Sequence, residues 1–68
     1  EMQKLTKTEI RWIINELENN ADDSMKMVSK TDDAFCQEYF RRRAENLYSI
    51  AHELRLALVN EDERIAIE

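Results

Sequence analysis

The chain of 68 residues contains no glycine and no proline. These two residues are the usual material of tight turns, bulges and helix C-caps, so their absence argues against β-sheets and against folds with many corners. Leu, Glu, Arg, Ala, Lys and Met, which favour helices, recur throughout instead. We therefore predict an all-α protein with a single turn.

Cysteine and histidine are almost as scarce. Cys36 is the only cysteine, so no internal disulfide can form, and no cluster of Cys and His suggests a metal site. We expect no metal and no cofactor. One free thiol is typical of a reducing compartment, and the sequence shows neither a secretory leader nor an apolar run that would span a bilayer. These features predict a cytoplasmic protein.

Strong positive charge is also missing. The formal net charge is −5, which disfavours general nucleic-acid binding because that needs clustered Lys and Arg. The hydrophobic content of 43% is too high for a disordered acidic tail. A chain this short buries a thin core and usually depends on disulfides, metal or oligomerisation. Only the last remains, so we expect a homodimer.

The first helix has a clear start. Thr6-Lys7-Thr8-Glu9 matches a capping box, and Leu5 and Ile10 have the spacing of a hydrophobic staple. The helix is predicted over about 7–29. Its apolar stripe follows a spacing of three and four residues: Ile10, Ile13, Ile14, Leu17, Ala21, Ser24, Met25 and Val28.

The break between helices falls at about 29–32, where Thr31 or Asp32 can cap a second helix. That helix is predicted over about 33–60, and the tail 61–68 either continues it or stays extended. Residues 1–68 then form one helical-hairpin domain; the alternative is one continuous helix. The wide apolar face of the second helix comprises Cys36, Phe40, Leu47, Ile50, Ala51, Leu54, Ala57 and Leu58.

A second apolar strip on this helix, Tyr48, His52, Leu56 and Val59, favours burial on two sides. We therefore predict an antiparallel hairpin that pairs with a second copy into a homodimeric four-helix bundle. Cys36 is expected to be buried and inert. Asp22 and Lys26 have the spacing of an ion pair.

Trp12 lies about 160° from the centre of the first stripe, among polar residues. An exposed indole is a plausible hot spot for a protein partner, although it could also pack in a dimer or over lysine stems. The candidate partner-binding residues are Trp12, Glu16, Asp23, Tyr48, His52 and Leu56.

Arg41-Arg42-Arg43 is the only basic run, and its side chains point in three directions on a helix. Arg42 can pair with Glu38. Arg43 falls near the middle of the apolar face, where it could pair with a carboxylate across the bundle. The alternative is a nucleic-acid contact made by Arg41, Arg42 and Arg55.

Chain length, one turn, an acidic balance and the stretch Ala44-Glu45-Asn46-Leu47-Tyr48 together resemble the Rop family of plasmid copy-number RNA-binding hairpins. The resemblance implies a dimeric four-helix bundle and RNA binding. The pattern as a whole favours a small non-enzymatic regulator or adaptor that occludes a partner protein, because no nucleophile, base and orienting group fall into place. The alternatives are a Rop-like RNA-binding dimer, an acidic DNA mimic and a structural assembly subunit.

Overall fold

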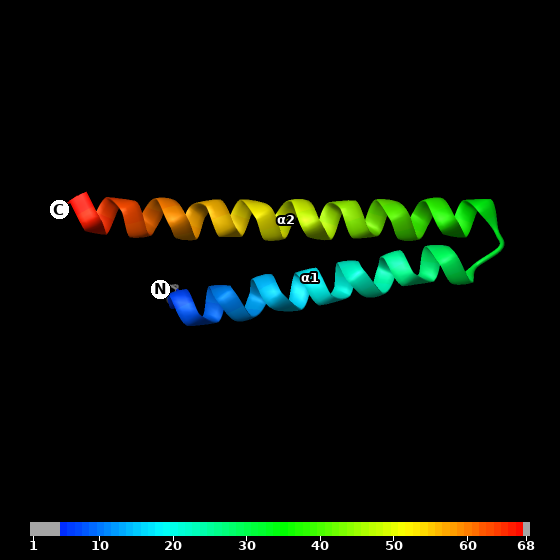
Figure 1. The fold of residues 1–68 in the computed structure, drawn as a ribbon, viewed down its shortest axis with the longest axis horizontal. Coiled ribbons are helices and arrows are strands. Elements are labelled where there is room, and N and C mark those ends of the chain that lie inside the picture. Colours follow the sequence, from blue (N-terminus) through cyan, green and yellow to red (C-terminus); the bar gives the residue numbers. More distant parts are fainter. Residues whose placement is uncertain (1–4, 68) are drawn as a thin grey trace, which may run out of the picture.

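The computed structural model describes the backbone of residues 5–67 and the side chains of residues 5–60. Helix α1 (Lys7–Lys30) and helix α2 (Ala34–Ile67) run antiparallel and pack against each other, joined by a turn at residues 31–33 (Figure 1). The predicted hairpin is confirmed, and the alternative of one continuous helix is wrong. Figure 1 also shows α2 continuing past the level at which α1 begins.

The start of α1 is the predicted capping box. The Glu9 backbone N–H donates to Thr6 Oγ1 at 3.1 Å, and the Thr6 N–H donates to Glu9 Oε1 at 2.8 Å. Both orphan donors are thereby satisfied. At the other end Thr31 adopts an extended conformation, with φ −110° and ψ 140°, and closes the helix.

The cap of α2 is Asp33 rather than Thr31 or Asp32. The Phe35 N–H donates to Asp33 Oδ1 at 2.9 Å, which is the usual N-cap bond. Thr31 is already the C-cap of α1, and its carbonyl oxygen accepts a 2.7 Å hydrogen bond from Gln37 Nε2. The prediction missed that Thr31 ends α1. The N-cap of α2 therefore falls later in the turn, at Asp33.

Helix α2 is longer than predicted, because its backbone continues from residue 60 through Ile67. No glycine or proline occurs anywhere in the chain, so no strong helix-terminating residue stands at 60–67. The second of the two possibilities for the tail, an extended segment, is therefore wrong over 61–67.

Small side chains dominate the contact between the helices. The residues with less than a tenth of their surface exposed are Ile14, Ala21, Ser24, Ala44, Ala51 and Leu58. Consecutive members lie three or seven residues apart along each helix, as in a coiled-coil seam, and we call this contact the seam. The Ser24 hydroxyl donates to the Phe40 carbonyl oxygen of the facing helix at 2.8 Å. A side chain reaches the backbone of another helix in this way only where the two backbones come close.

The seam is narrower than the predicted apolar faces. Ile13 and Ile50 are 38% and 51% exposed. Cys36 is exposed, so the prediction of a buried thiol is wrong, and Arg43 is exposed in the hairpin as well. For Ile13, Arg43 and Ile50 the reason is geometric: each directly precedes a seam residue, so it lies about 100° away around the helix, at the edge of the contact. The prediction also left out Ala44, which is fully buried.

Enlarging a seam alanine tests this packing. Ala44→Leu should lower the free energy of unfolding by about 1–3 kcal/mol, because the extra carbons have no room between the helices. Urea denaturation at fixed protein concentration measures the effect. Ala34 is exposed at the start of α2, so Ala34→Leu should stay within about 0.5 kcal/mol of the parent chain. Equal losses in the two variants would contradict a close helix contact at Ala44.

Candidate interaction surface

One side of the seam is closed by polar contacts between the helices. The Tyr48 hydroxyl of α2 donates to an Asp22 carboxylate oxygen of α1. Further along, Arg55 Nη2 of α2 lies 2.7 Å from Glu18 Oε2 of α1. We call this side, defined by these four residues, the bridged flank.

The other side of the seam is of different composition. Five of its six residues directly precede a seam residue, and the sixth, Met27, lies seven residues after Asn20 on the same side of α1. The six are Ile13, Asn20 and Met27 on α1, and Arg43, Ile50 and Ala57 on α2. Because the helices are antiparallel, these two rows fall on the same side of the contact, opposite the bridged flank. We call it the open flank. Within the described side chains, no hydrogen bond or ion pair joins α1 to α2 here.

Tyr48 was predicted as part of a second apolar strip, together with His52, Leu56 and Val59, that would be buried against another chain. Its hydroxyl is instead engaged with Asp22, and this hydrogen bond to a carboxylate raises the pKa of Tyr48 above its usual value. His52, Leu56 and Val59 are exposed in the hairpin.

The arginines of the alternative nucleic-acid site all form ion pairs within the hairpin. Arg42 Nε lies 2.8 Å from Glu38 Oε2, as the spacing predicted, and Arg41 pairs with the same carboxylate. Arg41 also reaches Glu45 at 3.7 Å. Hydrogen bonds from Arg42 and Arg41 lower the pKa of Glu38. Since Arg55 is held by Glu18, all three candidate phosphate contacts already have carboxylate partners.

The outer face of α1 carries three of the predicted partner-binding residues. Trp12 is 65% exposed and points away from α2. Glu16 is exposed one turn further along α1, and Asp23 is exposed on the same helix about three turns from Trp12. Lys26 Nζ lies 4.0 Å from Asp23 rather than pairing with Asp22, whose carboxylate accepts from Tyr48. Opposite-charge side chains thus share this part of the surface.

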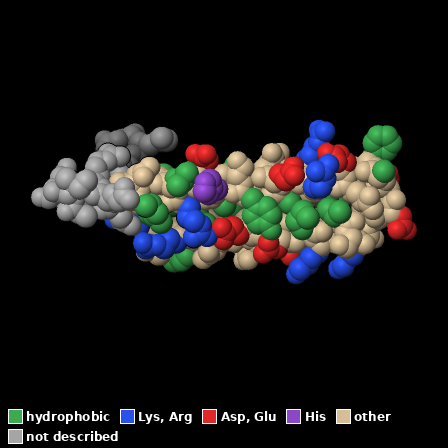
Figure 2. Space-filling view, turned by 45° about the horizontal axis from the view of Figure 1, so that its top comes forward, with side chains coloured by type: hydrophobic (Ala, Val, Ile, Leu, Met, Phe, Trp, Pro, Cys, Tyr) green, Lys and Arg blue, Asp and Glu red, His purple; other side chains and the backbone are tan. Residues whose placement is uncertain are grey.

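The six predicted partner-binding residues do not form one surface. Trp12 lies on the side of α1 remote from the seam and Leu56 on the side of α2 remote from the seam, so the two project in opposite directions. Tyr48 lies between them on the bridged flank. Figure 2 shows one long face of the hairpin, on which acidic and basic side chains are interspersed with hydrophobic ones.

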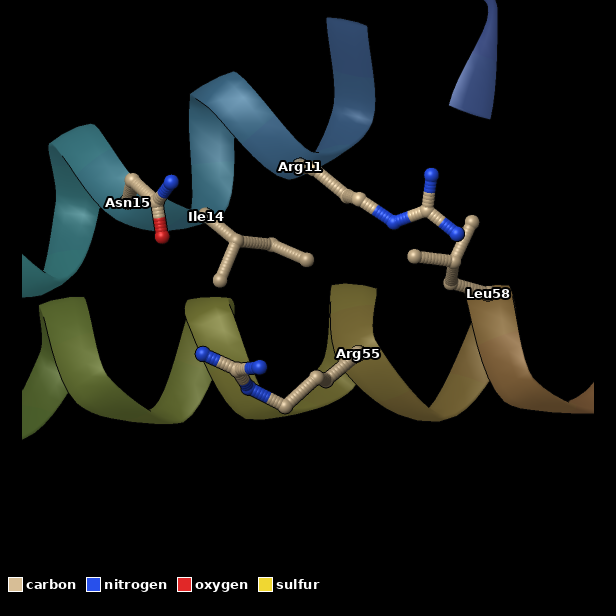
Figure 3. Close-up of a pocket in the computed structure, with 5 residues that line it drawn as sticks. All are labelled: Arg11, Ile14, Asn15, Arg55 and Leu58. Atoms are coloured by element: carbon tan, nitrogen blue, oxygen red, sulfur yellow. The ribbon is translucent and has the colours of Figure 1, made fainter. Parts of the chain in front are cut away.

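A shallow pocket of about 170 Å³ lies between the helices near the start of α1. Its lining residues are Arg11, Ile14, Asn15, Arg55 and Leu58. Figure 3 shows the Arg11 side chain extending towards Leu58, while Arg55 passes below Ile14 and Asn15. Of the two arginines that line the pocket, Arg55 is already bound by Glu18.

Cys36 is exposed in the first turn of α2, against the prediction of a buried thiol. Its Sγ donates to Asp33 Oδ2 at 3.4 Å. The hydrogen bond to Asp33 and the negative charge of that carboxylate raise the thiol pKa above its usual value. A raised pKa leaves little reactive thiolate at neutral pH.

Comparison with known proteins identifies no relative: no family, no curated protein and no solved structure matches this chain. Across the described residues, no helix is both long enough and apolar enough to cross a bilayer. Nor does that part of the chain bring three or more His, Cys, Asp or Glu side chains together in a way that could hold a metal ion.

The environment of Cys36 gives a direct test of the turn geometry. Asp33→Asn keeps a residue that caps helices well but removes the negative charge, so the pKa of the Cys36 thiol should fall. Thiolate absorbance followed against pH measures it. Asp32→Asn removes a neighbouring charge that makes no bond to Cys36 and serves as the control. A thiol pKa that is unchanged in the Asp33 variant would contradict the Cys36–Asp33 contact.

Proposed function

We propose that this protein is a small non-enzymatic regulator or adaptor that acts by protein–protein interaction. Its working form would be a homodimeric four-helix bundle, and its outer surface would dock on a partner protein. One observation carries the proposal: in the hairpin, large apolar side chains remain exposed on several sides while the buried core is thin. Isolated hairpins of this size rarely hold together without further burial.

The outer face of α1 is the part best suited to a foreign partner. Tryptophan is enriched among residues that dominate binding energy, and Trp12 is the largest side chain on this face. Glu16, one turn further along α1, would favour a partner with a basic rim around an apolar groove. Binding there would occlude the partner's surface, which is how a protein of this size could inhibit without catalysis.

Rop-like RNA binding is less well supported. It needs basic side chains that are free to contact phosphates, and Arg41, Arg42 and Arg55 are each paired with a carboxylate. Breaking these pairs would reduce the electrostatic gain that drives such binding. The net charge of −5 also disfavours RNA binding.

Site-specific photo-crosslinking tests the proposed partner face. A photoreactive phenylalanine analogue placed at Trp12, in the organism that encodes the protein, should give one defined protein adduct because the indole position would lie inside the interface. The same analogue at Ser49, which is exposed on α2, provides the control. Absence of an adduct at position 12, or the same adducts at both positions, would overturn the assignment of this face.

A further inference from the structure

We propose that the open flank is the interface of the homodimer, and that Arg43 pairs there with a carboxylate of a second copy. This inference rests on the proposed dimer and specifies which surface makes it. The prediction from sequence placed the dimer on the strip that contains Tyr48, His52 and Leu56. The contacts across the bridged flank shift the assignment to the opposite side of the hairpin.

The apolar character of the open flank is the first step. Ile13, Met27 and Ile50 are 38%, 39% and 51% exposed, so the hairpin covers only part of each side chain. A helix that packs on one neighbour needs apolar residues only along the seam. On both helices, further apolar residues lie beside the seam, on the open flank. This pattern is typical of helices that pack on two neighbours in a bundle.

The charge of Arg43 is the second step. Arg41, Arg42 and Arg55 all have a carboxylate partner within the hairpin. Arg43 stands among the apolar residues of the open flank, and none of the described carboxylates lies within ion-pair distance of it. An arginine on an apolar surface costs free energy when the surface is covered, unless the covering molecule supplies a negative charge.

The edges of the same flank supply that negative charge. Asp23 follows Asn20 by three residues on α1, and Glu53 follows Ile50 by three residues on α2, so both carboxylates border the open flank. Asp23 is 74% exposed, with Lys26 at 4.0 Å as its partner. A surface that carries a cation with no carboxylate partner among residues 5–60, together with bordering anions, is self-complementary, as a two-fold interface requires. These charges favour a second copy of this chain as the occupant.

Variants on two faces of α2 test the location of the interface. Ile50→Glu should weaken dimerisation about tenfold or more, because it places a charge in the apolar centre of the interface. Leu56→Glu introduces the same charge on the outer face of α2 and should leave the dimer unchanged. Sedimentation equilibrium gives the dissociation constants, and circular dichroism reports helix content. Equal effects of the two substitutions would overturn the assignment to the open flank.

Mixing charge-reversed chains tests the Arg43 pair and separates a contact between copies from one within a chain. Arg43→Glu and Asp23→Arg should each weaken self-association, while the mixture of the two should form heterodimers in preference. The same preference with Glu53→Arg in place of Asp23→Arg would equally support the pair and would place α2 against α2. If neither mixture prefers the heterodimer, the Arg43 pair is wrong.

The wild-type chain separates this inference from the proposed function. A dimer that survives Ile50→Glu would leave the dimer standing and overturn its location on the open flank. A wild-type chain that is monomeric at every concentration would overturn both. Weaker dimerisation of Ile50→Glu, with Leu56→Glu unchanged, and a heterodimer preference in one mixture are together the result expected here.

Discussion

The close approach of the two helices is the constraint on which the rest of the structure depends. Ala21, Ser24, Ala44 and Ala51 place almost no side-chain volume between the backbones. The Ser24 hydroxyl can therefore reach the carbonyl oxygen of Phe40 on the facing helix. The helices pack closely because the side chains between them are small. For the same reason the hairpin buries little apolar surface area. Ile14 and Leu58 are the large apolar side chains buried in the seam, whereas Ile13 and Ile50 lie at the edge of the contact.

The two flanks of this narrow seam differ in composition. On the bridged flank, Tyr48 and Arg55 reach across to carboxylates of α1 and close the edge with polar groups. On the open flank, Ile13 and Ile50 remain half covered, and Arg43 has no carboxylate within reach among the described residues. Exposed ion pairs contribute little stability, whereas covering aliphatic side chains contributes more. The asymmetry therefore favours association through one side of the hairpin, with the outer face of α1 left for another protein.

Much of the fold could be predicted because its signals are local. The capping box at Thr6 and the spacing of apolar residues gave the hairpin and the start of α1. The exposure of Cys36, Arg43 and Ile50 could not be read from the same spacing, because neighbours one residue apart differ by about 100° and a wide stripe hides which of them meets the other helix. The N-cap at Asp33 and the contacts that define the bridged flank depend on how α2 is placed against α1. The spacing of residues within one helix does not specify that placement.

The molar mass in solution is the most direct test of the claim that one hairpin is an incomplete core. Light scattering after gel filtration, over a dilution series of the wild-type chain, should give twice the chain mass of 8.1 kDa and hold that value on dilution into the micromolar range. Circular dichroism on the same samples should show a fully helical protein. A helical, cooperatively folding species of 8.1 kDa at every concentration would contradict the claim, because the seam alone would then suffice.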